Sequence, residues 1–254
     1  MGTFMWTWAR AHAVVAPLNL LIFYFYFFIV AANQVPLVRD GVHTAVMAAA
    51  RAHAGNVEVA RAACAVLRSL ACAADNCVPL VRASAHAAVM AAARAHAGDV
   101  EVERAACDTL RNLAAAADNR VPLVRDGAHT TVLAAARVHV GNVEVARHAC
   151  TALKYLAVAA GNKASLERDD THKAVMAAAR AHGGDVEVAR AACATLRYLT
   201  QNADNRERLL WDGAHTAVKA MARAHRGDAE VVRAASFMLQ YRKVYGEKCV
   251  CVVQ

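Results

Sequence analysis

Histidine, a common metal ligand and general base, recurs through this sequence at a fixed interval of 43 residues. Ten of the twelve histidines form two series with this spacing: His43, His86, His129, His172 and His215, and His53, His96, His139, His182 and His225. Within one interval the two members stand ten residues apart, about 15 Å along a helix and on different faces. The ligands of one metal ion must all lie about 2.1 Å from it, so the series are interpreted as copied structural positions. No metal or cofactor is predicted.

Cysteine, a candidate nucleophile, gives a third series at Cys64, Cys107, Cys150 and Cys193. Neighbouring helices pack about 10 Å apart, whereas a disulfide needs Cα atoms about 4.4–6.8 Å apart. These thiols are therefore expected to be small buried hydrophobes in a reducing compartment. The sequence also has no glycine-rich phosphate loop, no HExxH and no nucleophile elbow, so the chain is predicted not to be an enzyme.

The interval reflects an internal repeat. The octapeptide VEVARAAC at Val57–Cys64 returns at Val100, Val143 and Val186 with at most one substitution, and a looser copy begins at Ala229. An alanine-rich composition with only 12 glycines and 4 prolines indicates an all-α chain. The repeats are headed by asparagines that suit helix N-caps: Asn33, Asn76, Asn119, Asn162 and Asn205. They divide the chain into residues 1–32, five repeats at 33–75, 76–118, 119–161, 162–204 and 205–246, and a tail at 247–254.

Each repeat is predicted to contain three helices. A short first helix follows the asparagine, and a second runs from His43 to a glycine stop at Gly55 in the first repeat. The third helix starts at a cap residue such as Asn56, and at about 100° per residue its core face holds Ala60, Ala63, Cys64, Leu67, Leu70, Ala71 and Ala74. One repeat cannot cover this apolar stripe alone, so the repeats are expected to stack as a solenoid.

The pattern resembles armadillo repeats over Asn33 to about Tyr245. The match is best at TLRNLA, Thr109–Ala114, with Asp118-Asn119 heading the next unit and Asp126-Gly127-Ala128 between its first two helices. The resemblance implies a right-handed, all-α armadillo-type solenoid. Ser84 and Asp170 replace the glycine that other repeats have between these two helices, and those two turns are expected to be distorted.

The resemblance also implies that the third helices line a groove for an extended peptide or a partner helix. Importin-alpha-like members hold basic peptides with a ladder of Asn and Trp on this helix. In this sequence the residues at the Asn place of the five repeats are Ser69, Asn112, Tyr155, Tyr198 and Tyr241. The residues at the Trp place are Ala65, Asp108, Thr151, Ala194 and Phe237. A nuclear import adaptor is therefore not favoured. The predicted function is a non-catalytic scaffold or adaptor for a protein or peptide partner, in the cytoplasm.

Basic residues follow the third helices in two rows. The first arginine row is Arg61, Arg104, Arg147, Arg190 and Arg233, and the second basic row is Arg68, Arg111, Lys154 and Arg197. With a net charge of +8, these rows suit an acidic or phosphorylated ligand. A competing interpretation is an ordinary ion pair, because a glutamate stands three residues before each arginine of the first row: Glu58, Glu101, Glu144, Glu187 and Glu230.

The three tyrosines at the Asn place are expected to be exposed anchors for the partner. The alternative function is a basic solenoid that binds RNA or phosphorylated ligands, since basic grooves with aromatic residues also bind single strands. The paired glutamates dilute the positive field and make this alternative weaker.

The two ends depart from the repeat. Leu20–Val30 reads LLIFYFYFFIV within the uncharged stretch Ala13–Val38, which suits a divergent capping helix, a membrane anchor, a signal peptide or an artefact of the gene model. The chain ends in Cys251-Val-Val-Gln254, a prenylation pattern, with Cys249 as a second candidate for lipidation. Membrane association through either terminus is therefore a further prediction.

Overall fold

The computed structural model describes the backbone of residues 34–249 and the side chains of residues 34–240. Within these ranges there are fifteen α-helices and two short 3-10 helices, and no strand. The first helices of the five repeats are α3 (Gln34–Arg39), α6 (Ala74–Arg82), α9 (Arg120–Arg125), α12 (Lys163–Arg168) and α15 (Ala203–Trp211). The 3-10 turns η1 (Ala117–Asn119) and η2 (Ala160–Asn162) precede α9 and α12.

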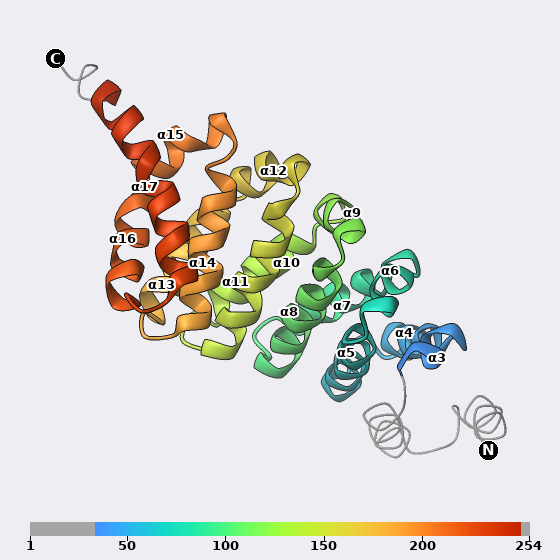
Figure 1. The fold of residues 1–254 in the computed structure, drawn as a ribbon. Coiled ribbons are helices and arrows are strands. Elements are labelled where there is room, and N and C mark those ends of the chain that lie inside the picture. Colours follow the sequence, from blue (N-terminus) through green and yellow to red (C-terminus); the bar gives the residue numbers. More distant parts are fainter. Residues whose placement is uncertain (1–33, 250–254) are drawn as a thin grey trace.

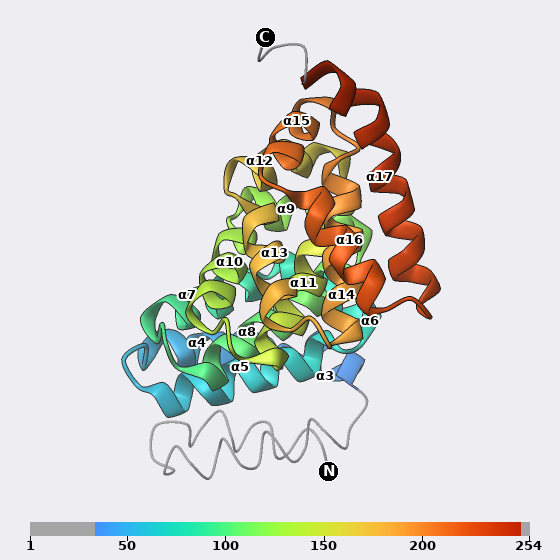
Figure 2. The same cartoon turned by 90° about the vertical axis from the view of Figure 1, so that its left-hand side faces the viewer.

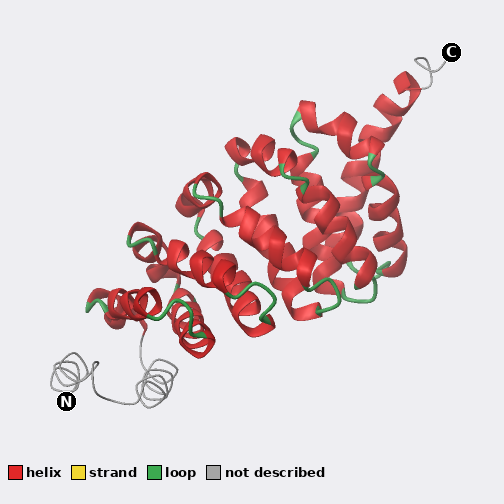
Figure 3. Ribbon diagram, turned by 180° about the vertical axis from the view of Figure 1, so that it is seen from behind, coloured by secondary structure: helices red, strands yellow, loops and turns green. Residues whose placement is uncertain are grey.

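The second helices are α4 (Val42–Ala52), α7 (Ala85–Ala95), α10 (Ala128–Val138), α13 (Thr171–Ala181) and α16 (Ala214–Ala224). The third helices, which are the longest, are α5 (Val57–Ala71), α8 (Val100–Ala115), α11 (Val143–Val158), α14 (Val186–Leu199) and α17 (Ala229–Cys249). Second helices pack on second helices and third on third, so each class forms a layer along the molecule (Figures 1 and 2). Short loops join the helices throughout the described chain (Figure 3). The predicted all-α, armadillo-type solenoid is confirmed.

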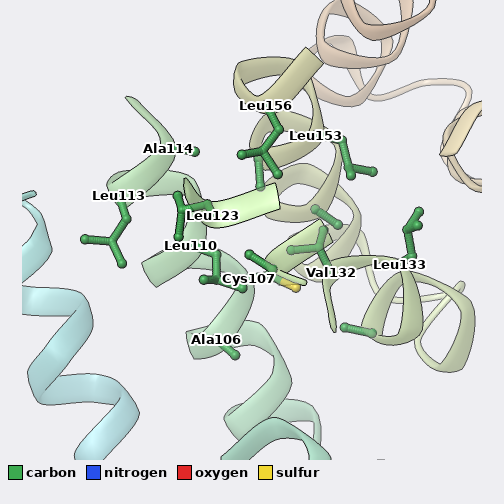
Figure 4. Close-up of a cluster of buried hydrophobic side chains, with 14 of the residues drawn as sticks. Ala106, Cys107, Leu110, Leu113, Ala114, Leu123, Val132, Leu133, Leu153 and Leu156 are labelled. Carbon is green, nitrogen blue, oxygen red and sulfur yellow. The ribbon is translucent and has the colours of Figure 1, made fainter. Parts of the chain in front are cut away.

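A continuous core runs between the layers. Leucines of the third helices, such as Leu110, Leu113, Leu153 and Leu156, are at most 1% exposed and interlock with residues of the neighbouring repeat (Figure 4). The predicted core face of α5 is buried from Ala60 to Ala71, while Ala74 instead begins α6 and is exposed. Burial of this stripe by the next repeat supplies the main driving force for stacking.

The cysteine series behaves as expected. Cys64, Cys107, Cys150 and Cys193 are buried free thiols. Burial raises the pKa of Cys64, Cys150 and Cys193 to about 12, and it raises that of Cys107 as well. A thiol that stays protonated at neutral pH is neither a nucleophile nor a ready metal ligand, so these side chains act as core residues.

The third helices begin as predicted, but the second helices end differently. Oδ1 of Asn56 accepts hydrogen bonds from the backbone N–H groups of Glu58 and Val59, and the cap residues of the other third helices accept in the same way. The second helix of the first repeat ends at Ala52, ahead of the predicted stop at Gly55. The corresponding glycines of the five repeats are Gly55, Gly98, Gly141, Gly184 and Gly227, and among them only Gly98 has a left-handed φ, at 97°.

The turn between the first and second helices is the same in every repeat. Gly41, Gly127 and Gly213 have φ of 82° to 86°, and Ser84 and Asp170 adopt the same left-handed region at 64° and 59°. The expected distortion at Ser84 and Asp170 is therefore wrong. Stacking fixes the direction in which each second helix starts, so these two residues accept a backbone conformation that disfavours a Cβ atom.

The variant Ser84→Gly is expected to stabilise the fold by about 0.5–1 kcal/mol, because glycine removes the strain at φ 64° but adds some disorder to the unfolded chain. The measurement is the midpoint of urea denaturation. Asp170→Gly serves as the comparison, since Asp170 also contacts Arg208 and Lys173 and its removal offsets the gain. A Ser84→Gly protein less stable than the original would show that the turn is not strained.

Four of the five asparagines at the heads of the repeats lie within the described residues, and each of these bridges two repeats instead of capping a helix. Nδ2 of Asn119 donates to the backbone oxygens of Leu113 and Cys77, both at 2.9 Å, and the side chain is 2% exposed. Asn76, Asn162 and Asn205 make the same pair of bonds. The predicted N-cap role is wrong for these four, because the buried amide meets carbonyl groups that need a donor.

Candidate partner-binding surface

The predicted site residues lie along one side of the third helices. Arg61 and Ser69 are on α5, Arg104 and Asn112 on α8, Arg147 and Tyr155 on α11, Arg190 and Tyr198 on α14, and Arg233 on α17. All nine side chains are exposed or half-buried, and we call this surface the third-helix face. The side chains of Tyr241 and Cys249, the whole of Cys251 and residues 1–32 lie outside the described parts of the chain.

Carboxylates hold the first arginine row. Nη1 of Arg61 donates to Glu58 at 2.9 Å, and Nε and Nη2 donate to the carboxylate of Asp99 at 3.2 and 2.6 Å. Asp99 is the N-cap of α8 in the next repeat, so the guanidinium group joins two repeats. The same bridge recurs as Arg147 with Glu144 and Asp185, and as Arg190 with Glu187 and Asp228.

Two arginines of the row lack the bridge. Asn142 caps α11, where the other junctions have aspartate, and among the described residues Arg104 forms an ion pair with Glu101 alone, at 2.8 Å. Arg233 is exposed and makes no ion pair with any described residue. The ion-pair interpretation is thus confirmed for Arg61, Arg104, Arg147 and Arg190, and most of the positive charge of this row is already balanced within the protein.

The bridges lower the pKa of the three aspartates. The hydrogen bond from Arg61 holds the pKa of Asp99 below its ordinary value, against the opposing effect of burial. The bond from Arg147 does the same for Asp185, and that from Arg190 for Asp228. Each of these carboxylates stays ionised and paired at neutral pH, so the bridge belongs to the fold and not to a ligand site.

Two members of the second basic row, Lys154 and Arg197, lie against aromatic rings. Nζ of Lys154 is 4.9 Å from the centre of the Tyr155 ring, and the guanidinium carbon of Arg197 is 4.3 Å from that of Tyr198 and 5.9 Å from that of Phe237. Tyr155 and Tyr198 were expected to be exposed anchors, but both are half-buried and pack against the core. Their rings therefore sit in fixed orientations beneath cations.

The second and third repeats differ from the others at two places on this face. Asp108, 9% exposed, accepts hydrogen bonds from Arg111 at 2.9 and 2.5 Å, and its Oδ1 is 3.6 Å from Nδ1 of His148. Burial lowers the pKa of His148 despite this carboxylate. Nearby, Nδ2 of Asn112 approaches Sγ of Cys72 at 3.6 Å, a weak contact that leaves the amide able to serve a partner.

Sequence reasoning missed the role of the first histidine series. Nε2 of His86, His129 and His172 donates to Asp126, Asp169 and Asp212 of the next repeat, at 3.1, 2.7 and 2.7 Å. The partners are always 40 residues apart, a regularity visible in the sequence. In the second series, Nε2 of His96, His182 and His225 donates to a backbone oxygen of the preceding repeat. Three members of each series therefore join repeats, as copied structural positions.

The second histidine series has one exception. Glu103 occupies a buried position of α8 that is alanine or valine in the other repeats, and its Oε2 is 2.5 Å from Nε2 of His139. His139 therefore pairs with this carboxylate instead of a backbone oxygen. The exception lies on the core side of α8 and adds nothing to the third-helix face.

A denser cluster joins the fourth and fifth repeats. His172 is fully buried, and its Nδ1 lies 3.0 Å from Oε1 of Glu167 without forming an aligned hydrogen bond. Glu167 takes a core position that is valine in the first three repeats and contacts Arg208 at 3.6 Å. Although burial opposes the charge, Glu167 and Asp212 together raise the pKa of His172 above its ordinary value.

The described residues contain neither a cluster suited to a metal ion nor a helix suited to crossing a membrane. No group of three or more His, Cys, Asp or Glu side chains has an arrangement that would hold a metal ion there. In the same part of the chain, no helix combines the length and apolar character needed to span a bilayer.

Comparison with known proteins agrees with the architecture. The family model described as LRRK2 ARM repeat matches residues 41–171, just over half of the chain. Among curated proteins, none matches. Armadillo repeats generally mediate protein interactions, and their solenoid is generally a non-catalytic scaffold. The chain belongs to the armadillo repeat family described as LRRK2 ARM repeat.

Proposed function

We propose that this protein is a non-catalytic scaffold that binds a segment of a partner protein along its third-helix face. The observation that carries the proposal is the group of cation–aromatic contacts on α11, α14 and α17, formed by Lys154 with Tyr155 and by Arg197 with Tyr198 and Phe237. Large rings held by packing lose little freedom on binding, which is why aromatic and arginine side chains dominate binding hot spots.

Charge favours an acidic or mixed acidic and apolar segment. Lys154 and Arg197 have no carboxylate partner among the described side chains, unlike most of the first arginine row. Asn112 adds an amide that can bond to the backbone of an extended segment, and Ser69 adds a hydroxyl group. Of the two basic rows, the second is therefore the better candidate for contact with a partner, and a cytoplasmic partner is the simplest expectation for a protein with free thiols.

Replacing Tyr155 and Tyr198 together with alanine is expected to weaken partner binding by about 2–4 kcal/mol, on the order of 30- to 1,000-fold in affinity. A photo-crosslinking residue at Ser69 or Asn112 would capture the partner from nuclease-treated lysate, and one at Ala134 on α10 provides the control position. Protein adducts that form at the third-helix positions and vanish in the double variant support the proposal. Equal capture at Ala134 contradicts it. In a parallel lysate without nuclease, capture of RNA alone would favour the basic-solenoid alternative.

A further inference from the structure

The positive charge of this protein is concentrated in one layer. The five second helices contain seven basic residues and no acidic residue, which accounts for almost all of the formal net charge of +8. The basic residues are Arg51, Arg94, Arg137, Lys173, Arg180, Lys219 and Arg223. The third helices, by contrast, each begin with a glutamate in the first turn.

Five of these residues occupy the same place in each repeat. We call Arg51, Arg94, Arg137, Arg180 and Arg223 the second-helix arginines. All five are exposed, and none forms an ion pair with a described residue. The only polar contact described for the group is from Nη2 of Arg137 to the backbone oxygen of Asp169, at 3.4 Å. Their charge, unlike that of the first arginine row, is not balanced by carboxylates of the fold.

The aspartates between the first and second helices have partners of their own. Asp126, Asp169 and Asp212 directly follow the first helices and accept hydrogen bonds from the histidines of the preceding repeat, and Asp40 lies 3.9 Å from Arg39. Asp170 contacts Lys173 and Arg208. Among the second-helix basic residues, only Lys173 has a carboxylate partner in the described chain, so the positive charge of the other six is not paired.

Short side chains lie next to the second-helix arginines. The exposed positions nearest to them along each helix are alanine in most repeats, such as Ala48, Ala91, Ala134 and Ala220. The second helices lie next to one another in chain order (Figure 2), which places one guanidinium group per repeat at intervals of about 10 Å. The arginines therefore project from a surface of short side chains and can all approach a broad anionic surface.

The helix dipole does not explain this distribution. An arginine in the last turn does favour the C-terminal end of a helix, and this accounts for one cation per second helix. The same dipole favours acidic residues in the first turn, yet none of the five second helices has one there. Acidic residues are thus absent even where helix stability would favour them.

We propose that the second-helix arginines bind the anionic lipids of a membrane surface. Lipids move laterally, so each phosphate or carboxylate headgroup can meet a guanidinium group without any match in spacing, and Arg forms forked hydrogen bonds with both. Single-stranded RNA binding usually adds aromatic stacking, and the second helices contain no aromatic residue. An extended peptide gains its contacts in a groove, whereas these arginines stand on a surface of short side chains. The second-helix arginines are distinct from the third-helix face. The protein could therefore hold its partner on one surface while the other binds a bilayer.

The test measures partition of the full, unlipidated chain onto vesicles of phosphatidylcholine alone or with added phosphatidylserine. Binding is expected only with phosphatidylserine and should fall as salt is raised. The triple variant Arg94→Ala, Arg137→Ala, Arg180→Ala is expected to lose on the order of 100-fold in partition, about fivefold for each arginine. The matched control, Arg68→Ala, Lys154→Ala, Arg233→Ala, removes the same charge from the third-helix face and should bind vesicles as the original protein does.

Circular dichroism of both variants checks that the substitutions leave the fold intact. Equal partition onto both kinds of vesicle would mean that an apolar part of the chain, and not the arginines, binds the bilayer. That result would overturn the proposal. Equal losses of partition in the two triple variants would also overturn the proposal, because they would indicate an effect of net charge alone. Binding of single-stranded RNA but not of phosphatidylserine vesicles would assign the arginines to nucleic acid instead. None of these results depends on the photo-crosslinking experiment on the third-helix face.

Discussion

Asn119→Asp is expected to destabilise the fold by about 4 kcal/mol, because it places a carboxylate against two buried backbone oxygens. In the original protein, Nδ2 of Asn119 donates to the oxygens of Leu113 and Cys77. An ionised carboxylate cannot donate to either. Burial among acceptors favours the protonated acid, which can donate once, so part of the loss should be recovered at acidic pH. Chemical denaturation at neutral and acidic pH measures both effects.

Two alanine variants separate the bridging role from a capping role. Asn119→Ala leaves the two oxygens without a donor and should cost about 2–3 kcal/mol. Asn202 is a true N-cap, whose side chain accepts from the backbone N–H of Asp204 at 2.8 Å, and Asn202→Ala should cost about 1 kcal/mol. If the aspartate variant at 119 were no less stable than Asn202→Ala, the inter-repeat bridge would have no large energetic role.

His172→Ala is the second change with a large expected effect, a loss of about 3 kcal/mol. The variant leaves Glu167, 4% exposed, in the core without its imidazolium partner. The loss is at the lower end of what an unpaired buried charge costs, since Arg208 still contacts the same carboxylate. Thermal or urea denaturation of the full chain provides the measurement.

A double-mutant cycle tests the cause of this loss. Glu167→Val restores the residue found at the same place in the first three repeats and should be neutral or slightly stabilising. In that background, His172→Ala should cost clearly less than it does alone, because no buried carboxylate remains. Equal costs in the two backgrounds would mean that Glu167 and His172 are not coupled.

The same cluster sets a pH dependence. The folded pKa of His172 lies above its ordinary value of 6.5, so the contribution of the charged form to stability is complete below about 6.5. It is lost as the pH rises through the folded pKa. The groups that face the imidazole are Glu167 and Asp212, with Lys173 and Arg208 beside them. Glu167→Val should reduce this dependence, which a series of denaturation curves across neutral pH would reveal.

The helices could be predicted from the sequence because their signals are local. A cap such as Asn56 and the apolar stripe that follows it lie within one helix, and the structure agrees at both. The roles of Asn119 and His86 could not be predicted in this way, since their partners are 42 and 40 residues away, in a neighbouring repeat. Only the relative position of two stacked repeats shows that these side chains meet carbonyl groups and carboxylates.

The candidate site shows the same limit. The spacing predicted the contact of Arg61 with Glu58, whereas its second partner, Asp99, depends on stacking. Exposure of Tyr155 was predicted from its place on the outward side of the helix, but packing leaves it half-buried. The concentration of positive charge in the second helices is present in the sequence itself, although it gains meaning only when these helices form one layer.

The links between repeats also determine how such a chain can change in evolution. Each link takes one group from each of two adjacent repeats: Arg147 and Asp185, His129 and Asp169, or Asn162 and the oxygen of Arg120. A duplicated unit of 43 residues therefore carries one of the two groups of each link to the repeat before it and of each link to the repeat after it. Whole units can be gained without evolving a new interface, whereas an insertion of a single residue within a third helix would misalign several links at once. This constraint accounts physically for the constant interval of 43 residues from each copy to the next.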